Sequence, residues 1–217
     1  MNMYSISENQ DMRCISEEKS KVRDLLRKIR FTVSLEQYEI WSRDACIHIF
    51  ESIQTCDTAS SPHIMVYCAK FPELDTNPLI DLLFSKNIPV VVPIIQKEDV
   101  SLRFSYLKTR DVLVSSTFQV PEPIGAEIPA RPEDITIGII PMLGFGRDGS
   151  RIGYGAGYYD RFLQSHPHVY KIGVAFSCQE CDKIPVTADD IKMDLIITER
   201  GIVYGDVSLL TGDKLAI

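Results

Sequence analysis

The chain has 217 residues, of which 45% are hydrophobic and 24% are charged, and its formal net charge is −7. This length and composition are expected to bury one substantial core in a single domain. The negative charge argues against a general nucleic-acid binder, and no apolar run approaches the length of a membrane span. Because the first residues also lack a signal-peptide core, we expect a cytoplasmic protein, and we expect it to be a monomer.

The N-terminal region is expected to contain a polar, frayed segment (residues 1–15) and then an amphipathic helix (residues 16–33). The polar face of that helix carries a basic stripe at helical spacing, formed by Lys19, Arg23, Arg27 and Arg30. Spacing alone leaves two interpretations open, a solvated helix face or a surface that binds an anion.

Strands and helices are expected to alternate over the rest of the chain. The periodicity and the turn residues predict helices over residues 34–53 and 76–86, and strands over residues 63–70, 88–94, 102–107, 135–140, 170–176 and 195–198. A capping box and a threonine N-cap mark the helix starts, at Ser34 and Thr76. This alternation predicts a three-layer αβα fold of the α/β class, with a largely parallel central sheet in one domain (residues 16–205) and a tail (residues 206–217).

The most informative stretch is glycine-rich and lies directly after the strand expected over residues 135–140. Six of the twelve glycines fall within fourteen residues, at Gly144, Gly146, Gly149, Gly153, Gly155 and Gly157. The letters that follow, YYDRFLQ, read as the start of a helix. A strand, a glycine-rich loop and a helix N-terminus together can present backbone N–H groups to an anion, and Arg151 would add a bidentate donor. A tight turn with no ligand is the alternative.

Several common motifs do not fit these residues. The Gly144-x-Gly146-x-x-Gly149 spacing matches a dinucleotide fingerprint, but no helical periodicity starts there, so we interpret it as accidental. The phosphate-loop lysine, the Gly-x-Ser-x-Gly elbow and the kinase signatures are missing from the sequence. The pair Cys178-x-x-Cys181 is half of a zinc pattern without a second half, and we interpret it as coincidental.

Residues 141–160 resemble the signature of the 5-formyltetrahydrofolate cyclo-ligases, also called 5,10-methenyltetrahydrofolate synthetases. The matching residues are Pro141, Phe145, Gly149, Arg151, Gly153, Gly155, Gly157, Tyr158, Tyr159 and Asp160. Four positions depart from the family: Met142 replaces glycine, Ile152 leucine and Gly146 aspartate, and Asp189 stands where the family often has histidine. The resemblance extends from about Lys19 to about Thr198.

The resemblance implies an ATP site built from two parts of the chain. Lys19 and Arg23 match the N-terminal Lys-x-x-x-Arg of the family, which reaches the ATP phosphates. The rest of the implied ATP site is the loop formed by Arg151, Ile152, Gly153, Tyr154, Gly155, Ala156, Gly157, Tyr158 and Tyr159. Arg151 is the expected catalytic residue, and Asp160 and Asp190 are expected to hold Mg²⁺, which prefers carboxylate and phosphate oxygens.

The resemblance also implies a folate site that shares the loop from Tyr154 to Tyr158. Glu73 matches an acidic family position, where a carboxylate can accept hydrogen bonds from the pterin amino and ring N–H groups. Cys68 matches a substrate-lining position, and Phe118 stands where an aromatic residue would stack on the folate.

The implied reaction converts ATP and 5-formyltetrahydrofolate into 5,10-methenyltetrahydrofolate, ADP and phosphate. Phosphorylation of the formyl oxygen would turn a poor leaving group into a good one, so no enzyme nucleophile is required. Two alternatives stay open. The departures at Gly146 and Asp189 would suit a non-catalytic relative that binds folate or a nucleotide, and the same loop could serve a kinase-like or phosphosugar enzyme.

Overall fold

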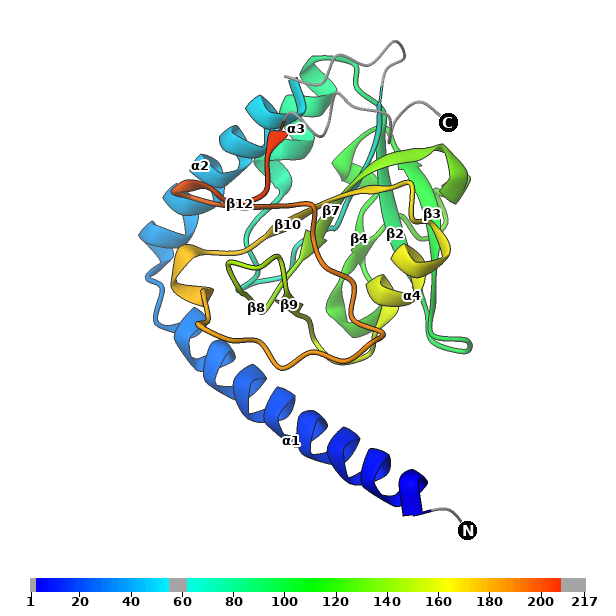
Figure 1. Cartoon of the computed structure of the whole chain (residues 1–217). Coiled ribbons are helices and arrows are strands. Elements are labelled where there is room, and N and C mark those ends of the chain that lie inside the picture. Colours follow the sequence, from blue (N-terminus) through cyan, green and yellow to red (C-terminus); the bar gives the residue numbers. More distant parts are fainter. Residues whose placement is uncertain (1–2, 55–61, 208–217) are drawn as a thin grey trace.

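The computed structural model describes residues 3–54 and 62–207, which form a central sheet between two helical layers (Figure 1). Within these residues the main sheet has eight strands in the order β12-β11-β10-β7-β1-β2-β3-β6. In chain order they are β1 (His63–Val66), β2 (Val90–Gln96), β3 (Ser101–Leu107), β6 (Ile128–Pro129), β7 (Ile135–Pro141), β10 (Tyr170–Val174), β11 (Leu195–Thr198) and β12 (Gly201–Tyr204). The neighbours β11, β10, β7, β1 and β2 run parallel, and β12, β3 and β6 add antiparallel edges. The predicted largely parallel sheet is confirmed.

Helices cover both faces of the sheet. They are α1 (Met3–Phe31), α2 (Leu35–Gln54), α3 (Asn77–Ser85) and α4 (Tyr158–Ser165). Side chains alternate along a strand, so Ile64 and Val66 of β1 pack with α2 and α3, whereas Met65 packs on the other face with Phe162 of α4. Strand β10 is buried along its whole length, as expected for a parallel strand covered on both faces.

Short elements complete the fold. Two hairpins pair β4 (Val114–Ser115) with β5 (Pro121–Glu122), and β8 (Gly144–Phe145) with β9 (Arg151–Ile152). Four 3₁₀ turns are η1 (Arg110–Val112), η2 (Thr117–Gln119), η3 (Pro132–Asp134) and η4 (Ser177–Gln179).

The order of the parallel strands creates a switch point between β1 and β7. These neighbours connect onward through opposite faces of the sheet, since α3 follows β1 on one face and α4 follows β7 on the other. Where connections diverge in this way, the carboxyl ends of the two strands leave a crevice, which is where open α/β sheets bind ligands. The fold therefore directs the search for a site to the loops after β1 and β7.

Three details differ from the sequence-based expectation. Helix α1 begins at Met3 and not near Ser16, because neither glycine nor proline interrupts residues 3–31. The strand expected to be last, β11, is followed by β12. The Thr76 hydroxyl does not cap α3, because it donates to the Tyr67 carbonyl oxygen at 2.6 Å.

The capping box at the start of α2 is confirmed, with Ser34 and Gln37 bonded reciprocally at 3.2 Å. Of the expected tail, residues 208–217 lie outside the described residues. No helix in residues 3–54 and 62–207 combines the length and apolar character that crossing a bilayer requires.

Candidate active site

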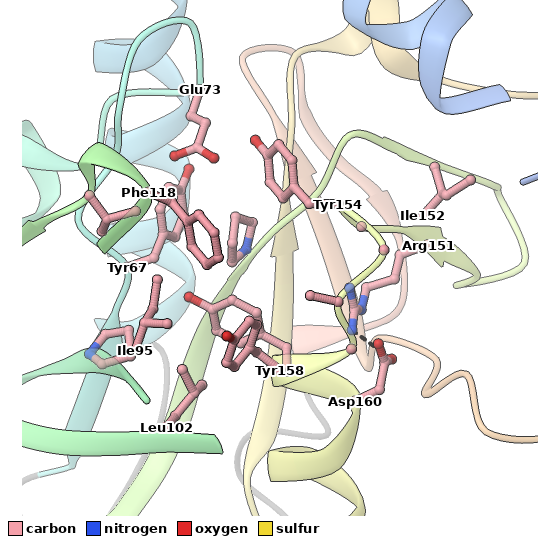
Figure 2. Close-up of a pocket in the computed structure, with 18 of the residues that line it drawn as sticks. Tyr67, Glu73, Ile95, Leu102, Phe118, Arg151, Ile152, Tyr154, Tyr158 and Asp160 are labelled. Atoms are coloured by element: carbon pink, nitrogen blue, oxygen red, sulfur yellow. Dashed lines mark hydrogen bonds and ion pairs between the residues drawn. The ribbon is translucent and has the colours of Figure 1, made fainter. Parts of the chain in front are cut away.

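A cavity of about 450 Å³ opens at the carboxyl ends of β1, β2 and β7, at the switch point (Figure 2). Every site residue predicted from the sequence lines it: Lys19, Arg23, Cys68, Glu73, Phe118, the continuous run from Arg151 to Asp160, and Asp190. The cavity wall also contains Pro141 of the family signature and residues to which the sequence assigned no role, namely Tyr67, Lys70, Pro93, Ile95, Leu102 and Val120. Most of these belong to β2, β3 and β7 or follow β1 and β4, so only the sheet order brings them to the cavity.

Helix α1 forms one wall of the cavity through residues one turn apart. Lys19 forms an ion pair with Asp190, and the Arg23 Nε donates to the Gly153 carbonyl oxygen at 3.0 Å. On the same face, Leu26 is buried against Leu143, Ile152 and Ile184. The basic stripe is therefore divided, because Lys19 and Arg23 face the cavity whereas Arg27 pairs with Asp24 in solvent.

The glycine-rich loop passes over the cavity between β9 and α4. Gly155 and Gly157 have φ angles of 107° and 71°, a region that side-chain-bearing residues rarely occupy. A Cβ at Gly155 would also come within 3.3 Å of the Arg23 guanidinium carbon. The backbone conformation at Gly155 therefore favours glycine, and a side chain there would crowd the Arg23 guanidinium on α1.

Arg151 is the most buried cation in the cavity wall, with a side chain that is 4% exposed. Its Nη2 donates to Asp160 Oδ1 at 2.6 Å. Its Nε is buried and has no hydrogen-bond partner among the described residues. A buried donor without a partner is costly, and an anion in the cavity would satisfy it.

Asp190 and Asp160 lie on the same rim. The Ile191 N–H donates to Asp160 Oδ1 at 3.3 Å, so the residue after Asp190 contacts the other carboxylate. Burial alone would raise the pKa of Asp190, but hydrogen bonds from Lys19 and the Thr187 backbone outweigh it and hold that pKa below the usual value. Asp190 is therefore charged at neutral pH in the paired state.

These carboxylates fit a magnesium ion that is shared with a phosphate ligand. Within the described residues no group of three or more His, Cys, Asp or Glu side chains could enclose a metal. Mg²⁺, however, commonly uses one or two carboxylates together with substrate phosphates. Asp160 and Asp190 supply that number of hard oxygen donors beside the cations of the cavity.

The opposite end of the cavity is built on the loop after β1. Glu73 is 7% exposed, and its Oε2 accepts from the Lys70 backbone N–H at 3.0 Å. Burial, with the charge of Glu122 adding to it, raises the pKa of the Cys68 thiol to about 12, so this residue is a neutral lining group. The ring of Phe118 is 53% exposed at the cavity edge, and the Phe118 carbonyl oxygen accepts from Lys70 Nζ at 2.9 Å.

Two tyrosines join the ends of the cavity. Burial raises the pKa of both Tyr154 and Tyr159 above the usual value, and the charge of Glu73 raises them further, so both hydroxyls are protonated at neutral pH. The Tyr154 ring stands between the glycine-rich loop and Glu73 (Figure 2). The Tyr154 hydroxyl accepts from Arg30 Nη1 at 2.8 Å.

The four departures from the family signature do not remove a group from the cavity. Gly146 and Asp189 are not part of its lining. In the turn that contains Gly146, the Asp148 carboxylate accepts from the Ser150 N–H at 3.1 Å and pairs with Lys192. Met142 is buried in the core, and Ile152 retains an apolar side chain in the wall.

Comparison with known proteins places the chain among relatives of one family. The 5-formyltetrahydrofolate cyclo-ligase family matches residues 15–199. The chain is 32% identical over 142 residues to the 5-formyltetrahydrofolate cyclo-ligase of Escherichia coli (62% of this chain, 76% of that protein). It is 28% identical over 153 residues to the mouse enzyme of the same name (64% and 74%).

Two solved structures share the fold. The NMR structure of Aquifex aeolicus 5,10-methenyltetrahydrofolate synthetase has a TM-score of 0.69 and 26% identity, covering 85% of this chain and 91% of that one. The Mycoplasma pneumoniae synthetase has a TM-score of 0.67 and 22% identity, covering 83% and 98%. The match over most of the sequence, joined to the glycine-rich loop and the cations of α1 around one cavity, shows that the chain belongs to the 5-formyltetrahydrofolate cyclo-ligase family.

Proposed function

We propose that this chain is the ligase that its family membership indicates, converting 5-formyltetrahydrofolate into 5,10-methenyltetrahydrofolate with ATP and Mg²⁺ and releasing ADP and phosphate. One observation carries the proposal. A single cavity has three cations at one end, Lys19, Arg23 and Arg151, and a buried carboxylate, Glu73, at the other. A phosphate donor and a pterin can thus meet in one enclosed space.

The chemistry needs positioning and charge stabilisation more than covalent catalysis. The formyl oxygen attacks the γ-phosphorus, and the bond from that phosphorus to ADP breaks. The second folate nitrogen then attacks the formyl carbon and loses its proton to water, the carbon–oxygen bond breaks, and phosphate leaves. The neutral Cys68 thiol agrees with a scheme that uses no enzyme nucleophile. As in other phosphoryl transfers, the protein contributes by holding the two substrates in line and neutralising charge.

The cations of the cavity would hold the ATP phosphates by exchanging partners. Without nucleotide, Lys19 is paired with Asp190 and Arg151 with Asp160. With ATP, Lys19 and Arg151 would donate to phosphate oxygens instead. Arg151 has the greater need of a new acceptor, because its Nε has no hydrogen-bond partner among the described residues. The two released carboxylates would hold Mg²⁺, which neutralises charge that develops on the phosphates.

The folate would occupy the end formed by Glu73, Cys68 and Phe118. The Glu73 carboxylate can accept from the pterin amino and ring N–H groups, and the half-exposed Phe118 ring can stack on an aromatic ring of the substrate. The glycine-rich loop from Tyr154 to Tyr158 lies between both substrates, so it would contact each.

The cellular setting belongs to the same proposal. We place the reaction in the cytoplasm, in a monomer that uses a small folate and ATP and has no nucleic-acid or membrane partner. The net charge of −7 supports the part that concerns nucleic acid.

The direct test is the near-ultraviolet absorbance of 5-formyltetrahydrofolate mixed with purified protein, ATP and Mg²⁺. We expect absorbance from the methenyl product to appear, and to depend on ATP and on Mg²⁺. Thermal melting with the formyl folate or with a sugar phosphate separates this proposal from a phosphosugar enzyme, because a ligand that binds the folded state raises the melting temperature. No product, together with stabilisation by the sugar phosphate alone, would contradict the proposal.

A further inference from the structure

Arg30, in the last turn of α1, is buried although no carboxylate pairs with it among the ion pairs of the described residues. Arg30 is 5% exposed, and it is not one of the residues that line the cavity. Arg30 Nη1 donates to the Tyr154 hydroxyl oxygen at 2.8 Å, and its guanidinium carbon lies 5.6 Å from the centre of the Tyr154 ring. Burying a guanidinium is costly, so this double contact with one tyrosine needs an explanation beyond packing.

The direction of the hydrogen bond between Arg30 and Tyr154 supplies that explanation. Arginine has only donors, so the Tyr154 oxygen must accept, and the hydroxyl proton must point elsewhere. The proton points to the Glu73 carboxylate, which accepts a hydrogen bond from the Tyr154 hydroxyl, and in Figure 2 the hydroxyl oxygen lies on the side of the ring that faces Glu73. The elevated pKa of Tyr154, caused first by burial and then by the charge of Glu73, keeps that proton in place at neutral pH. A donor and an acceptor therefore stand together at the folate end of the cavity.

We propose that Arg30 is a positioning residue, which orients the Tyr154 hydroxyl so that it donates to the Glu73 carboxylate and fixes the direction of that carboxylate in the cavity. The carboxylate held in this way would accept from adjacent N–H donors on the edge of a planar ring, which is the edge that a pterin presents. The inference rests on the proposed function and adds a second, previously unassigned element of its substrate specificity.

The placement of Arg30 also explains how one helix serves both substrates. Lys19 and Arg23 reach the phosphate end from the middle of α1, and Arg30 reaches the folate end through Tyr154. Because Arg30 acts through the tyrosine hydroxyl, its effect on the folate must disappear when that hydroxyl is absent. A merely structural arginine would show no such dependence.

The test is a double-mutant cycle read by calorimetric binding of 5-formyltetrahydrofolate in the absence of ATP. The variants are Arg30→Met, Tyr154→Phe and the two combined. We expect each single change to weaken folate binding about tenfold, the range for one buried hydrogen bond, and the double variant to be no weaker than either. Arg30→Met is expected to leave the affinity for ATP with Mg²⁺ within about twofold of the wild type.

Arg27→Met is the matched control, because it makes the same substitution one turn earlier on the solvent side of α1. It is expected to leave folate binding unchanged. If Arg30→Met loses its helical circular dichroism, Arg30→Ala, which also removes the donor to the Tyr154 oxygen, replaces it in the cycle. Additive losses in the double variant, or an equal loss of ATP and folate affinity in the Arg30 variant, would overturn the inference. A wild-type protein that does not bind the formyl folate overturns the proposed function, and this inference with it.

Discussion

At the scale of single residues, the ion pairs of this protein differ in burial between the site and the surface. Arg151 is 4% exposed and its partner Asp160 is 24% exposed, so this pair is shielded from water. By contrast, Arg110 and Asp81 form a pair on the surface, 39% and 54% exposed. Shielded charges interact strongly and are costly to leave unpaired, whereas exposed pairs contribute little. The same chemical change should therefore have different results at these two places.

Asp160→Asn is expected to lower ATP-dependent turnover at least about 100-fold, because it removes a proposed metal ligand and the partner of Arg151. It should also lower the free energy of unfolding by about 1–3 kcal/mol, since the buried Arg151 keeps its charge. Asp81→Asn, the matched control, should change stability by no more than about 1 kcal/mol and leave turnover intact. Steady-state kinetics and urea unfolding measure both effects. Unchanged turnover in Asp160→Asn would contradict the proposed role of Asp160.

At the scale of elements, the glycine-rich loop works only because α1 lies against it. The loop conformation at Gly155 is left-handed, with a φ of 107°, and the Arg23 guanidinium lies over the position where a Cβ would stand. Gly125 has a similar φ of 82°, but nothing lies within 4 Å of its Cβ position. The two glycines therefore share the backbone requirement and differ in the contact with α1.

Gly155→Ala and Gly125→Ala are expected to lower the free energy of unfolding by similar amounts, about 1–2 kcal/mol each, because both place a Cβ in a left-handed conformation. Only Gly155→Ala should raise the KM for ATP, by about tenfold, because it displaces Arg23 from the phosphate end. Thermal unfolding measures the loss of stability caused by backbone strain, and initial-rate kinetics measure the change in the KM for ATP. An equal rise in KM for the Gly125 variant would mean that backbone strain alone impairs the enzyme.

At the scale of the whole molecule, the parallel sheet buries polar groups along with its apolar core. The five described cysteines are free thiols, and two of them, Cys46 and Cys68, are buried. Burial raises the pKa of each of these two thiols to about 12. An unfolded chain would lose both thiol protons near pH 8.5, so the folded state binds more protons than the unfolded state above that pH.

Stability is therefore expected to fall as the pH rises from about 8.5 toward 12, and to be insensitive to these thiols at lower pH. Each thiol contributes a slope of about 1.4 kcal/mol per pH unit within that window. Urea unfolding at a series of pH values measures the slope. Cys46→Ala should reduce this slope by the contribution of one thiol, whereas Cys14→Ala, at an exposed position, should leave the slope unchanged. Equal slopes in all three proteins would show that the Cys46 proton is not linked to folding.

Local patterns in the sequence predicted most elements, and the family resemblance named residues that the fold brings to one cavity. The spacing of apolar residues, at every second position or at helical intervals, predicted the parallel strands and the four helices. These patterns reflect which side chains face a core. The β12 strand was missed because four residues after a two-residue turn carry too little pattern. Arg30 appeared only as part of a basic stripe, since helical spacing cannot distinguish a buried cation from a solvated one.

Contiguous sequence is enough to identify this protein as an α/β cyclo-ligase with a glycine-rich loop, because the glycines and the family signature lie in one stretch of the chain. Only the tertiary structure decided which distant groups meet there. Lys19 and Asp190 are 171 positions apart, and Arg30 and Tyr154 are 124 apart. Their contacts depend on the strand order and on where α1 packs beside the β8–β9 hairpin, and those are set by burial of the whole core, which no local pattern contains.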